Sequence, residues 1–198
     1  MRSDVAGILL AAGEGSRLGR PKALVRIAGQ SLADRGVGML RAGGAAPVVL
    51  VTGAASAEPL GALIVHNPGW RSGMGSSLAA GLSALPDTAA AAVIALADQP
   101  LVGPEAVRRL IAAYRGGASV AVACYDGQPR NPVLIARAHW PEVIETSVGD
   151  TGARAFLHAR PALVTPVECG DTGSPDDIDT PEDLDRVSRA VESPGTRG

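Results

Sequence analysis

The sequence predicts an α/β protein, a three-layer α/β/α sandwich built on a mostly parallel sheet. Short apolar runs alternate with segments whose apolar residues repeat at helical spacing, a pattern typical of parallel strands joined by helices. Aromatic residues make up only 3% of the chain, so the core must be built from Val, Leu, Ile and Ala. These small aliphatic side chains suit helices packed against a buried sheet.

Six apolar runs are too short, and mostly too rich in β-branched residues, to be buried helices, so we expect strands buried on both faces. They are Val5–Leu10, Pro47–Thr52, Leu63–Val65, Ala91–Ala97, Ser119–Cys124 and Pro132–Ala136. The two clearest helical patterns cover residues 32–40 and, after Pro104, residues 107–114. Strands and helices therefore alternate along the chain.

Polar or glycine residues follow three of these strands directly. Gly13 follows the first strand, Asn67 the Leu63 strand and Asp98 the Ala91 strand. Ligands of such sheets bind beyond the carboxyl ends of the strands, so we expect these three segments to meet at one rim.

The length of 198 residues fits one domain, which we expect to span residues 1–191. Residues 192–198 are rich in Ser, Pro and Gly and are expected to form a disordered tail. Cys124 and Cys169 form no C-x-x-C motif, and the chain shows neither a secretory segment nor a membrane-spanning apolar run. We therefore expect a cytoplasmic protein.

The charge of the chain bears on its partners. With 18 basic and 20 acidic residues the net charge is −2, and the basic residues form no stripe. Nucleic-acid and anionic-membrane partners therefore have no electrostatic support, and a small molecule is the expected partner.

The segment from Leu10 to Lys22 joins the first strand to a glycine-rich loop that carries three cations. Glycines at positions 13, 15 and 19 allow positive φ and amides that converge on one anion, while Arg17 and Lys22 add charge. The pattern predicts phosphate binding. A plain glycine-rich turn with solvated charges is the alternative.

Two better-known phosphate loops do not fit this segment. A P-loop requires Gly-Lys-Ser/Thr, but Lys22 lies between Pro21 and Ala23. The dinucleotide fingerprint G-x-G-x-x-G opens a helix, whereas here the glycines follow a different spacing and no helical pattern begins before Ser31.

Two carboxylates are candidate metal ligands. Asp98 ends a buried strand and is followed by Gln99 and Pro100, so it is held at the ligand edge of the sheet. Asp179 lies just before a helix start marked by Thr180 and Pro181. One or two carboxylates plus substrate phosphates are the usual Mg²⁺ ligands, although a solvated turn residue remains the alternative for Asp179.

Two further turns precede predicted helices. Ser76 and Ser77 lie near the start of the segment 73–82, where they act either as ligand contacts or as ordinary serine caps. Asp150 and Arg154 lie on the turn 149–154, where an exposed ion pair is the alternative to a functional role.

Taken together, these motifs resemble the nucleotidyltransferase family that matures the molybdenum cofactor, and most closely its cytidylyltransferase branch. The likeness covers nearly the whole chain, in order, and rests on six motifs. They are Leu10-Ala11-Ala12-Gly13-x-x-x-Arg17-x-Gly19-x-x-Lys22, Gly73-Met74 to Leu82, Ala97-Asp98-Gln99-Pro100, Asn131-Pro132-Val133, Gly149-Asp150-x-Gly152-Ala153-Arg154 and Asp177-Ile178-Asp179-Thr180-Pro181. The resemblance implies a Rossmann-like sheet of the nucleotide-diphospho-sugar (NTP) transferase type.

The resemblance also implies a reaction, in which the terminal phosphate of molybdopterin attacks the α-phosphate of CTP and releases pyrophosphate. Lys22, Arg17 and Asp98 would be catalytic, and Asp98 and Asp179 would bind Mg²⁺. The residues implied to bind nucleotide or acceptor are Ala11, Ala12, Gly13, Gly15, Ser77, Asn131 and Arg154. A molybdoenzyme, or the chaperone that matures it, would receive the product.

Other activities remain open at this stage. Ala12, Asp177 and Asp179 match the cytidylyl branch better than the guanylyl branch, which keeps guanylyl transfer as the alternative. The family has Arg-Gly-His/Asn-Pro at this point, whereas this chain has Pro129-Arg130-Asn131-Pro132, so the arginine is displaced by one residue and its contact with the acceptor cannot be carried over. A non-catalytic pterin or nucleotide carrier and a nicotinamide-dependent oxidoreductase are the remaining alternatives.

Overall fold

The computed structural model describes residues 4–192, and its centre is a seven-stranded sheet in the order β5-β4-β1-β6-β8-β7-β9. The strands are β1 (Val5–Ala11), β4 (Val48–Thr52), β5 (Leu63–His66), β6 (Ala91–Leu96), β7 (Val120–Tyr125), β8 (Gln128–Ala136) and β9 (Val164–Glu168). β1 pairs in parallel with both β4 and β6, which places the carboxyl ends of three neighbouring strands at one edge.

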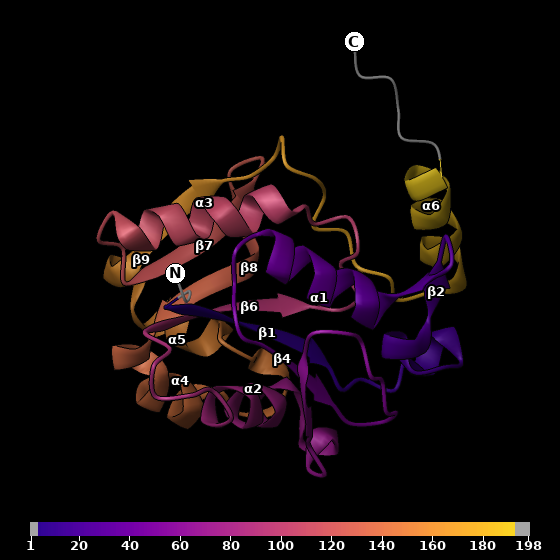
Figure 1. Cartoon of the computed structure of the whole chain (residues 1–198), viewed down its shortest axis with the longest axis horizontal. Helices are drawn as coiled ribbons and strands as arrows, with labels where there is room; N and C mark the ends of the chain where they lie inside the picture. The colour runs from indigo at the N-terminus through magenta and orange to yellow at the C-terminus, as the bar shows by residue number, and fades with distance from the viewer. Residues whose placement is uncertain (1–3, 193–198) are drawn as a thin grey trace.

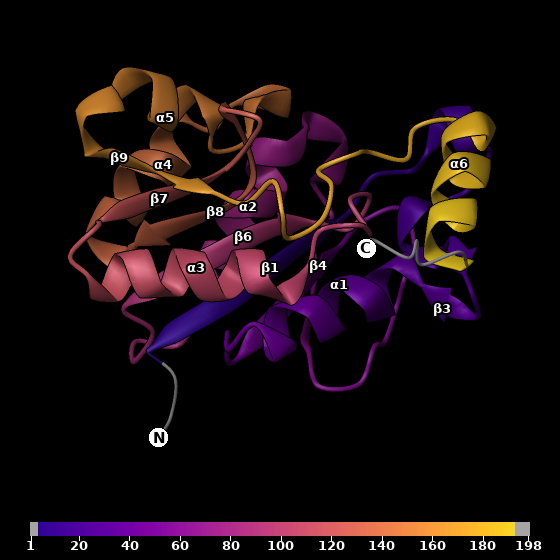
Figure 2. The same ribbon diagram turned by 90° about the horizontal axis from the view of Figure 1, so that it is seen from above.

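Helices cover both faces of the sheet, as Figures 1 and 2 show. Helices α1 (Leu32–Ala42) and α3 (Pro104–Arg115) lie on one face, and α2 (Met74–Ser83), α4 (Trp140–Thr146) and α5 (Arg154–Ala159) lie on the other. The predicted three-layer sandwich is therefore confirmed. Single-turn 3₁₀ helices are η1 (Ser16–Leu18), η2 (Lys22–Leu24), η3 (Trp70–Ser72), η4 (Arg137–His139), η5 (Gly149–Thr151) and η6 (Pro161–Leu163).

Strand β1 lies at the centre of the core, and all seven of its residues are buried. Because side chains alternate between the faces of a strand, Leu9 packs with the α1 residue Leu40, whereas Ile8 packs with Leu78 of α2. A continuous apolar run, rather than an alternating one, is what a strand covered on both faces requires.

A smaller apolar cluster lies beside the main sandwich. Helix α6 (Pro181–Glu192) packs there against the two-stranded hairpin of β2 (Arg26–Ile27) and β3 (Gln30–Ser31) (Figure 1). Ile178 is fully buried in this cluster, together with Val187. The segment that precedes α6 is thereby anchored next to the edge of the main sheet.

The strand predicted at residues 132–136 is antiparallel to both of its neighbours. Its direction follows from a tight hairpin with β7, in which Asp126 and Gly127 have φ of 51° and 72°. An Asp-Gly pair between two apolar runs is a strong hairpin signal, and it explains why β8 begins at Gln128.

Two edge strands also differ from the expectation. β5 was predicted to be buried on both faces, which is wrong, because Leu63 is 54% exposed and Ile64 is 42% exposed. An apolar run does not reveal whether its strand lies at an edge. β9 escaped prediction because its pattern is half-exposed and interrupted by Pro166, which an edge strand tolerates.

One observation concerns the predicted tail and another concerns membrane-spanning helices. α6 continues to Glu192, so the rest of the predicted tail, residues 193–198, lies outside the described residues. Within residues 4–192, the structure contains no helix that is both long and apolar enough to cross a membrane.

Both cysteines are buried and unpaired. Burial is the main cause that raises the pKa of Cys169 to about 11, from an ordinary value of 9.0. In the unfolded chain the thiol therefore loses its proton at lower pH than in the folded chain, so stability falls as pH rises between these two values.

We expect Cys169→Ala to reduce the loss of stability that the folded chain shows as pH rises. Between about pH 8 and about pH 10, the free energy of unfolding of the native chain should fall by about 1 kcal/mol more than that of the variant. Urea denaturation followed by circular dichroism measures both. Identical pH dependence in the two proteins would show that Cys169 does not contribute.

Candidate functional site

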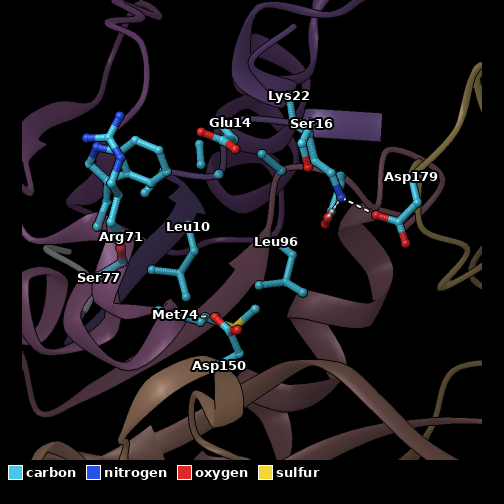
Figure 3. A pocket seen from close by; sticks show the side chains of 18 of the residues that line it. Leu10, Glu14, Ser16, Lys22, Arg71, Met74, Ser77, Leu96, Asp150 and Asp179 are labelled. Atoms are coloured by element: carbon cyan, nitrogen blue, oxygen red, sulfur yellow. Dashed lines mark hydrogen bonds and ion pairs between the residues drawn. The ribbon is translucent and has the colours of Figure 1, made fainter. Parts of the chain in front are cut away.

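A cavity of about 680 Å³ opens at the carboxyl ends of β1 and β6 (Figure 3). Its volume lies within the range of small-molecule sites. The lining comes from the glycine loop, the segment before α2, the end of β6 and two distant turns. The lining residues are Leu10 to Arg17, Lys22, Trp70, Arg71, Gly73, Met74, Ser77, Leu96 to Asp98, Asp150 and Asp179.

The glycine loop leaves β1 and turns back across the cavity. Gly15 and Gly19 have φ of 62° and 68°, and a Cβ on Gly15 would lie 2.1 Å from the carbonyl oxygen of Arg20. The predicted positive φ at Gly13 is wrong, since Gly13 is absent from the left-handed residues of the described chain. In that part of the chain the amides of residues 14–17 make no hydrogen bond to another residue, which leaves them free to bind an anion.

Lys22 lies between two carboxylates at one end of the cavity. Its Nζ donates to Asp98 Oδ2 at 2.7 Å and to Asp179 Oδ1 at 2.5 Å (Figure 3). Burial by itself would lower the pKa of Lys22, but the charge of Asp98 and the hydrogen bonds to both carboxylates outweigh it and raise the pKa. Lys22 is therefore an ammonium held by two anions.

Arg17 is a second cation at this end of the cavity. Its Nη1 lies 4.0 Å from Asp179 Oδ2, and its side chain is 75% exposed. A contact so long and so exposed contributes little, so the guanidinium is free to turn toward an anion in the cavity.

Gln99 fastens the turn that carries Asp179 to the end of β6. Its buried Nε2 donates to Asp177 Oδ1 at 2.8 Å and to the carbonyl oxygen of Pro175 at 3.1 Å. The amide of Ile178 donates to the carbonyl oxygen of Asp98 at 2.9 Å. Burial is the main cause that raises the pKa of Asp177, and the negative charge of the nearby Asp98 adds to it.

The donors present fit a hard divalent cation. Asp98 Oδ1 is buried and has no hydrogen-bond partner among residues 4–192. Within the same residues no group of three His, Cys, Asp or Glu side chains is arranged to hold a metal, and the acidic donors at this end of the cavity are the two carboxylates that contact Lys22. Such a site suits Mg²⁺, which takes its remaining ligands from water and substrate phosphates.

The start of α2 forms another wall of the cavity. Gly73 is the N-cap and has no side chain, so the amide of Met74 finds its partner in Asp150 Oδ1 at 3.3 Å. The structure shows no ion pair between Asp150 and Arg154 in its described part, so that alternative for the turn is wrong. Ser77 lines the cavity, whereas Ser76 does not.

Most of the predicted site residues come together in this cavity. Its lining includes Ala11, Ala12, Gly13, Gly15, Arg17, Lys22, Ser77, Asp98 and Asp179. Asn131 and Arg154 do not belong to it. Asn131 lies two residues before Val133, and Val133 is the first residue of β8 that pairs with β6. Arg154 is exposed at the start of α5. Their part in acceptor binding stays a prediction.

Sequence analysis missed Trp70 and Arg71, which line the cavity just before α2. The Arg71 guanidinium lies 4.4 Å from the centroid of the Trp70 ring, a cation–π contact. One signal was available, because both residues directly precede the glycine turn at Gly73. Without the fold, nothing distinguished them from surface residues.

Three comparisons place these features among known proteins. The family described as MobA-like NTP transferase domain matches residues 7–164. The nicotine blue oxidoreductase of Paenarthrobacter nicotinovorans is 39% identical, over 92% of this chain and 96% of that protein. A probable molybdenum cofactor guanylyltransferase of Opitutus terrae is 53% identical over 49 residues, which are 25% of this chain and 24% of that protein.

Solved structures agree with the fold. A Mycobacterium tuberculosis Rv0371c homologue from Mycobacterium sp. strain JC1 superposes with a TM-score of 0.83 at 28% identity. The match covers 98% of this chain and 100% of that one.

The Gln99 contacts generate a stability prediction. Gln99→Leu removes the hydrogen bonds from buried Gln99 to the Asp177 carboxylate and to the carbonyl oxygen of Pro175, which should lower the free energy of unfolding by about 1 kcal/mol. Urea denaturation at neutral pH measures the loss. Gln128→Leu, at an exposed position of β8, is the matched control and should change stability by less than about 0.5 kcal/mol.

Proposed function

Because the chain belongs to the MobA-like NTP transferase domain family, we propose that it is a nucleotidyltransferase that transfers CMP from CTP to molybdenum cofactor. The product would be molybdopterin cytosine dinucleotide, with release of pyrophosphate. The observation that supports this most is the Lys22 ammonium between Asp98 and Asp179, at the end of a glycine loop with free amides.

The proposed reaction exchanges one phosphate bond for another. An oxygen of the terminal phosphate of the acceptor bonds to the α-phosphorus of CTP, and the bond from that phosphorus to the bridging oxygen of pyrophosphate breaks. The attacking oxygen is already anionic, so no general base is needed. Catalysis then consists of positioning the two substrates and neutralising charge.

Each part of the cavity has a role in this proposal. The loop amides bind the triphosphate, Arg17 faces the leaving pyrophosphate and Lys22 faces the α-phosphate. Asp98 and Asp179 would hold Mg²⁺, which supplies charge neutralisation on the phosphates when bound. Asn131 and Arg154, outside this cavity, would contact the pterin acceptor.

Lys22 and a divalent cation compete for the same two carboxylates, although Asp98 Oδ1 is not used by Lys22. Lys22 already contacts Asp98 and Asp179 and neutralises much of their charge, so a bare cation would bind there against a neighbouring ammonium. A nucleoside triphosphate gives Lys22 another anionic partner and brings phosphate ligands for the cation. We therefore propose that nucleotide and Mg²⁺ bind together rather than independently.

Ala12, Asp177 and Asp179 favour CTP by resemblance to the cytidylyl branch. The short stretch shared with a probable molybdenum cofactor guanylyltransferase supports the same class of acceptor and keeps GTP as the competing nucleotide. Delivery of the product to a molybdoenzyme, or to its maturation chaperone, belongs to the same proposal.

A second candidate function rests on one specific observation. The relative that shares 39% identity over nearly its whole length is named an oxidoreductase. An activity of that class would require a reduced nicotinamide nucleotide in the cavity. Calorimetric titration with NADPH tests it directly, and tight NADPH binding without NTP binding would favour the oxidoreductase.

Pyrophosphate release is the deciding assay for the transferase. The purified chain, Mg²⁺ and isolated molybdenum cofactor are mixed with each of the four NTPs in turn, and pyrophosphate is measured by a coupled enzyme assay. We expect release with CTP that depends on the cofactor. Background rates with every NTP would contradict the transferase, and a rate with GTP alone would assign the guanylyl branch.

Asp98→Asn tests the proposed metal ligand. Loss of one carboxylate at the reacting phosphate should lower kcat by at least about 100-fold. Asp176→Asn is the matched control, because Asp176 lies in the segment before α6, pairs there with Arg186 of that helix and is outside the cavity lining. Wild-type turnover in the Asp98 variant would remove Asp98 from the metal site.

Lys22→Met tests the competition between Lys22 and a divalent cation. Without the ammonium, the two carboxylates should bind Mn²⁺ at least about tenfold more tightly in the absence of nucleotide. Electron paramagnetic resonance of free Mn²⁺ measures this without any turnover. Unchanged or weaker Mn²⁺ binding would show that Lys22 and the cation do not compete for these carboxylates.

A further inference from the structure

Asn67 is a buried amide that follows β5 and approaches the start of α2. Its Oδ1 accepts a hydrogen bond from the backbone amide of Gly69 at 2.9 Å. A backbone N–H can only donate, so this contact fixes which end of the side-chain amide is oxygen. The Nδ2 group therefore points toward the two serines of α2.

Both hydrogens of this Nδ2 group are used. One is donated to Ser76 Oγ at 2.9 Å and the other to Ser77 Oγ at 3.0 Å. Toward Asn67, each serine oxygen is thus an acceptor. Each hydroxyl proton must point elsewhere.

The two serine hydroxyl protons differ in whether an acceptor lies near them. Ser76 Oγ can donate to the carbonyl oxygens of Gly73 at 2.9 Å and Gly69 at 3.1 Å. For the Ser77 proton, the described residues offer no acceptor within hydrogen-bond distance. Ser77 is only 3% exposed, yet it lines the cavity, so its unused donor is available to a bound molecule.

Ser77 lies at the opposite end of the cavity from Lys22 and Asp179. In Figure 3, Ser77 and Arg71 are on one side, whereas Lys22 and Asp179 are on the other. Phosphates belong with Lys22 and the loop amides. The nucleoside of the same ligand then extends toward Ser77.

We propose that Asn67 is a positioning residue that holds the Ser77 hydroxyl as a hydrogen-bond donor toward an acceptor atom of the bound nucleoside. This inference rests on the proposed nucleotide binding and adds a determinant of nucleotide recognition. The acceptor is an oxygen of the base or of the ribose. Two CTP analogues distinguish these sources, since 2-thio-CTP replaces the base carbonyl oxygen by sulfur and 2′-deoxy-CTP lacks the ribose hydroxyl.

Asn67→Asp reverses the polarity of this arrangement with little change in shape. A carboxylate still accepts from the Gly69 amide, but it can only accept from Ser77, so the hydroxyl proton turns away from the cavity. The oxygen lone pairs of Ser77 then face the nucleoside acceptor. We expect the Kd for CTP, measured by calorimetry, to rise by more than tenfold.

A double variant separates positioning from mere support of α2. Ser77→Ala alone should raise the Kd by about tenfold, and Asn67→Asp combined with Ser77→Ala should bind CTP better than Asn67→Asp alone, because the misdirected hydroxyl is gone. A structural role of Asn67 would give no such recovery. Ser83→Ala, at an exposed position at the end of α2 and outside the cavity lining, is the control and should bind CTP like the native chain.

The analogues make the test independent of the Asn67 variants, should these fail to fold. Ser77→Ala should bind one analogue, 2-thio-CTP or 2′-deoxy-CTP, as well as the native chain binds it. A native chain that binds CTP while Ser77→Ala binds CTP equally well overturns this inference alone. A native chain that binds no NTP overturns the proposed function and this inference with it.

Discussion

The contact of the Lys22 ammonium with Asp98 and Asp179 is the interaction on which the candidate site depends. It joins the glycine loop, the end of β6 and the turn before α6, which are separated by 76 and 157 residues along the chain. Asp98 and Asp179 both lie within hydrogen-bond distance of the same ammonium, so their carboxylates would repel each other without a cation between them. The Gln99 contacts and the buried Ile178 hold the turn in place, but the charge balance rests on Lys22.

This arrangement is costly as a device for stability. Partly buried charges lose much of their hydration, and replacing such pairs by apolar residues often stabilises proteins. The buried Asp98 Oδ1, without a hydrogen-bond partner in the described chain, adds to the cost. A site that binds a cation and a polyphosphate accounts for both features, because each unsatisfied group then gains a partner.

The sequence alone predicted the parts of the site that follow buried strands. Gly13, Lys22 and Asp98 are close in sequence to β1 or β6, so the parallel sheet brings them together. Trp70 and Arg71 depend on how a loop crosses the edge of the sheet, and no periodic pattern encodes that path. The reversed direction of β8 was encoded in the Asp126-Gly127 turn, a local signal that the count of apolar runs overlooked.

The two ends of the cavity are held by different means, and in the proposed function this difference would give a bound nucleotide one orientation. At one end, full charges on Lys22 and the carboxylates would define where phosphates lie. At the other end, Asn67 uses a neutral amide, fixed by a backbone N–H, to decide where one hydroxyl proton points. Charges attract any polyphosphate, whereas a fixed donor discriminates among nucleosides, so under the proposed function affinity and selectivity would come from opposite ends of the same cavity.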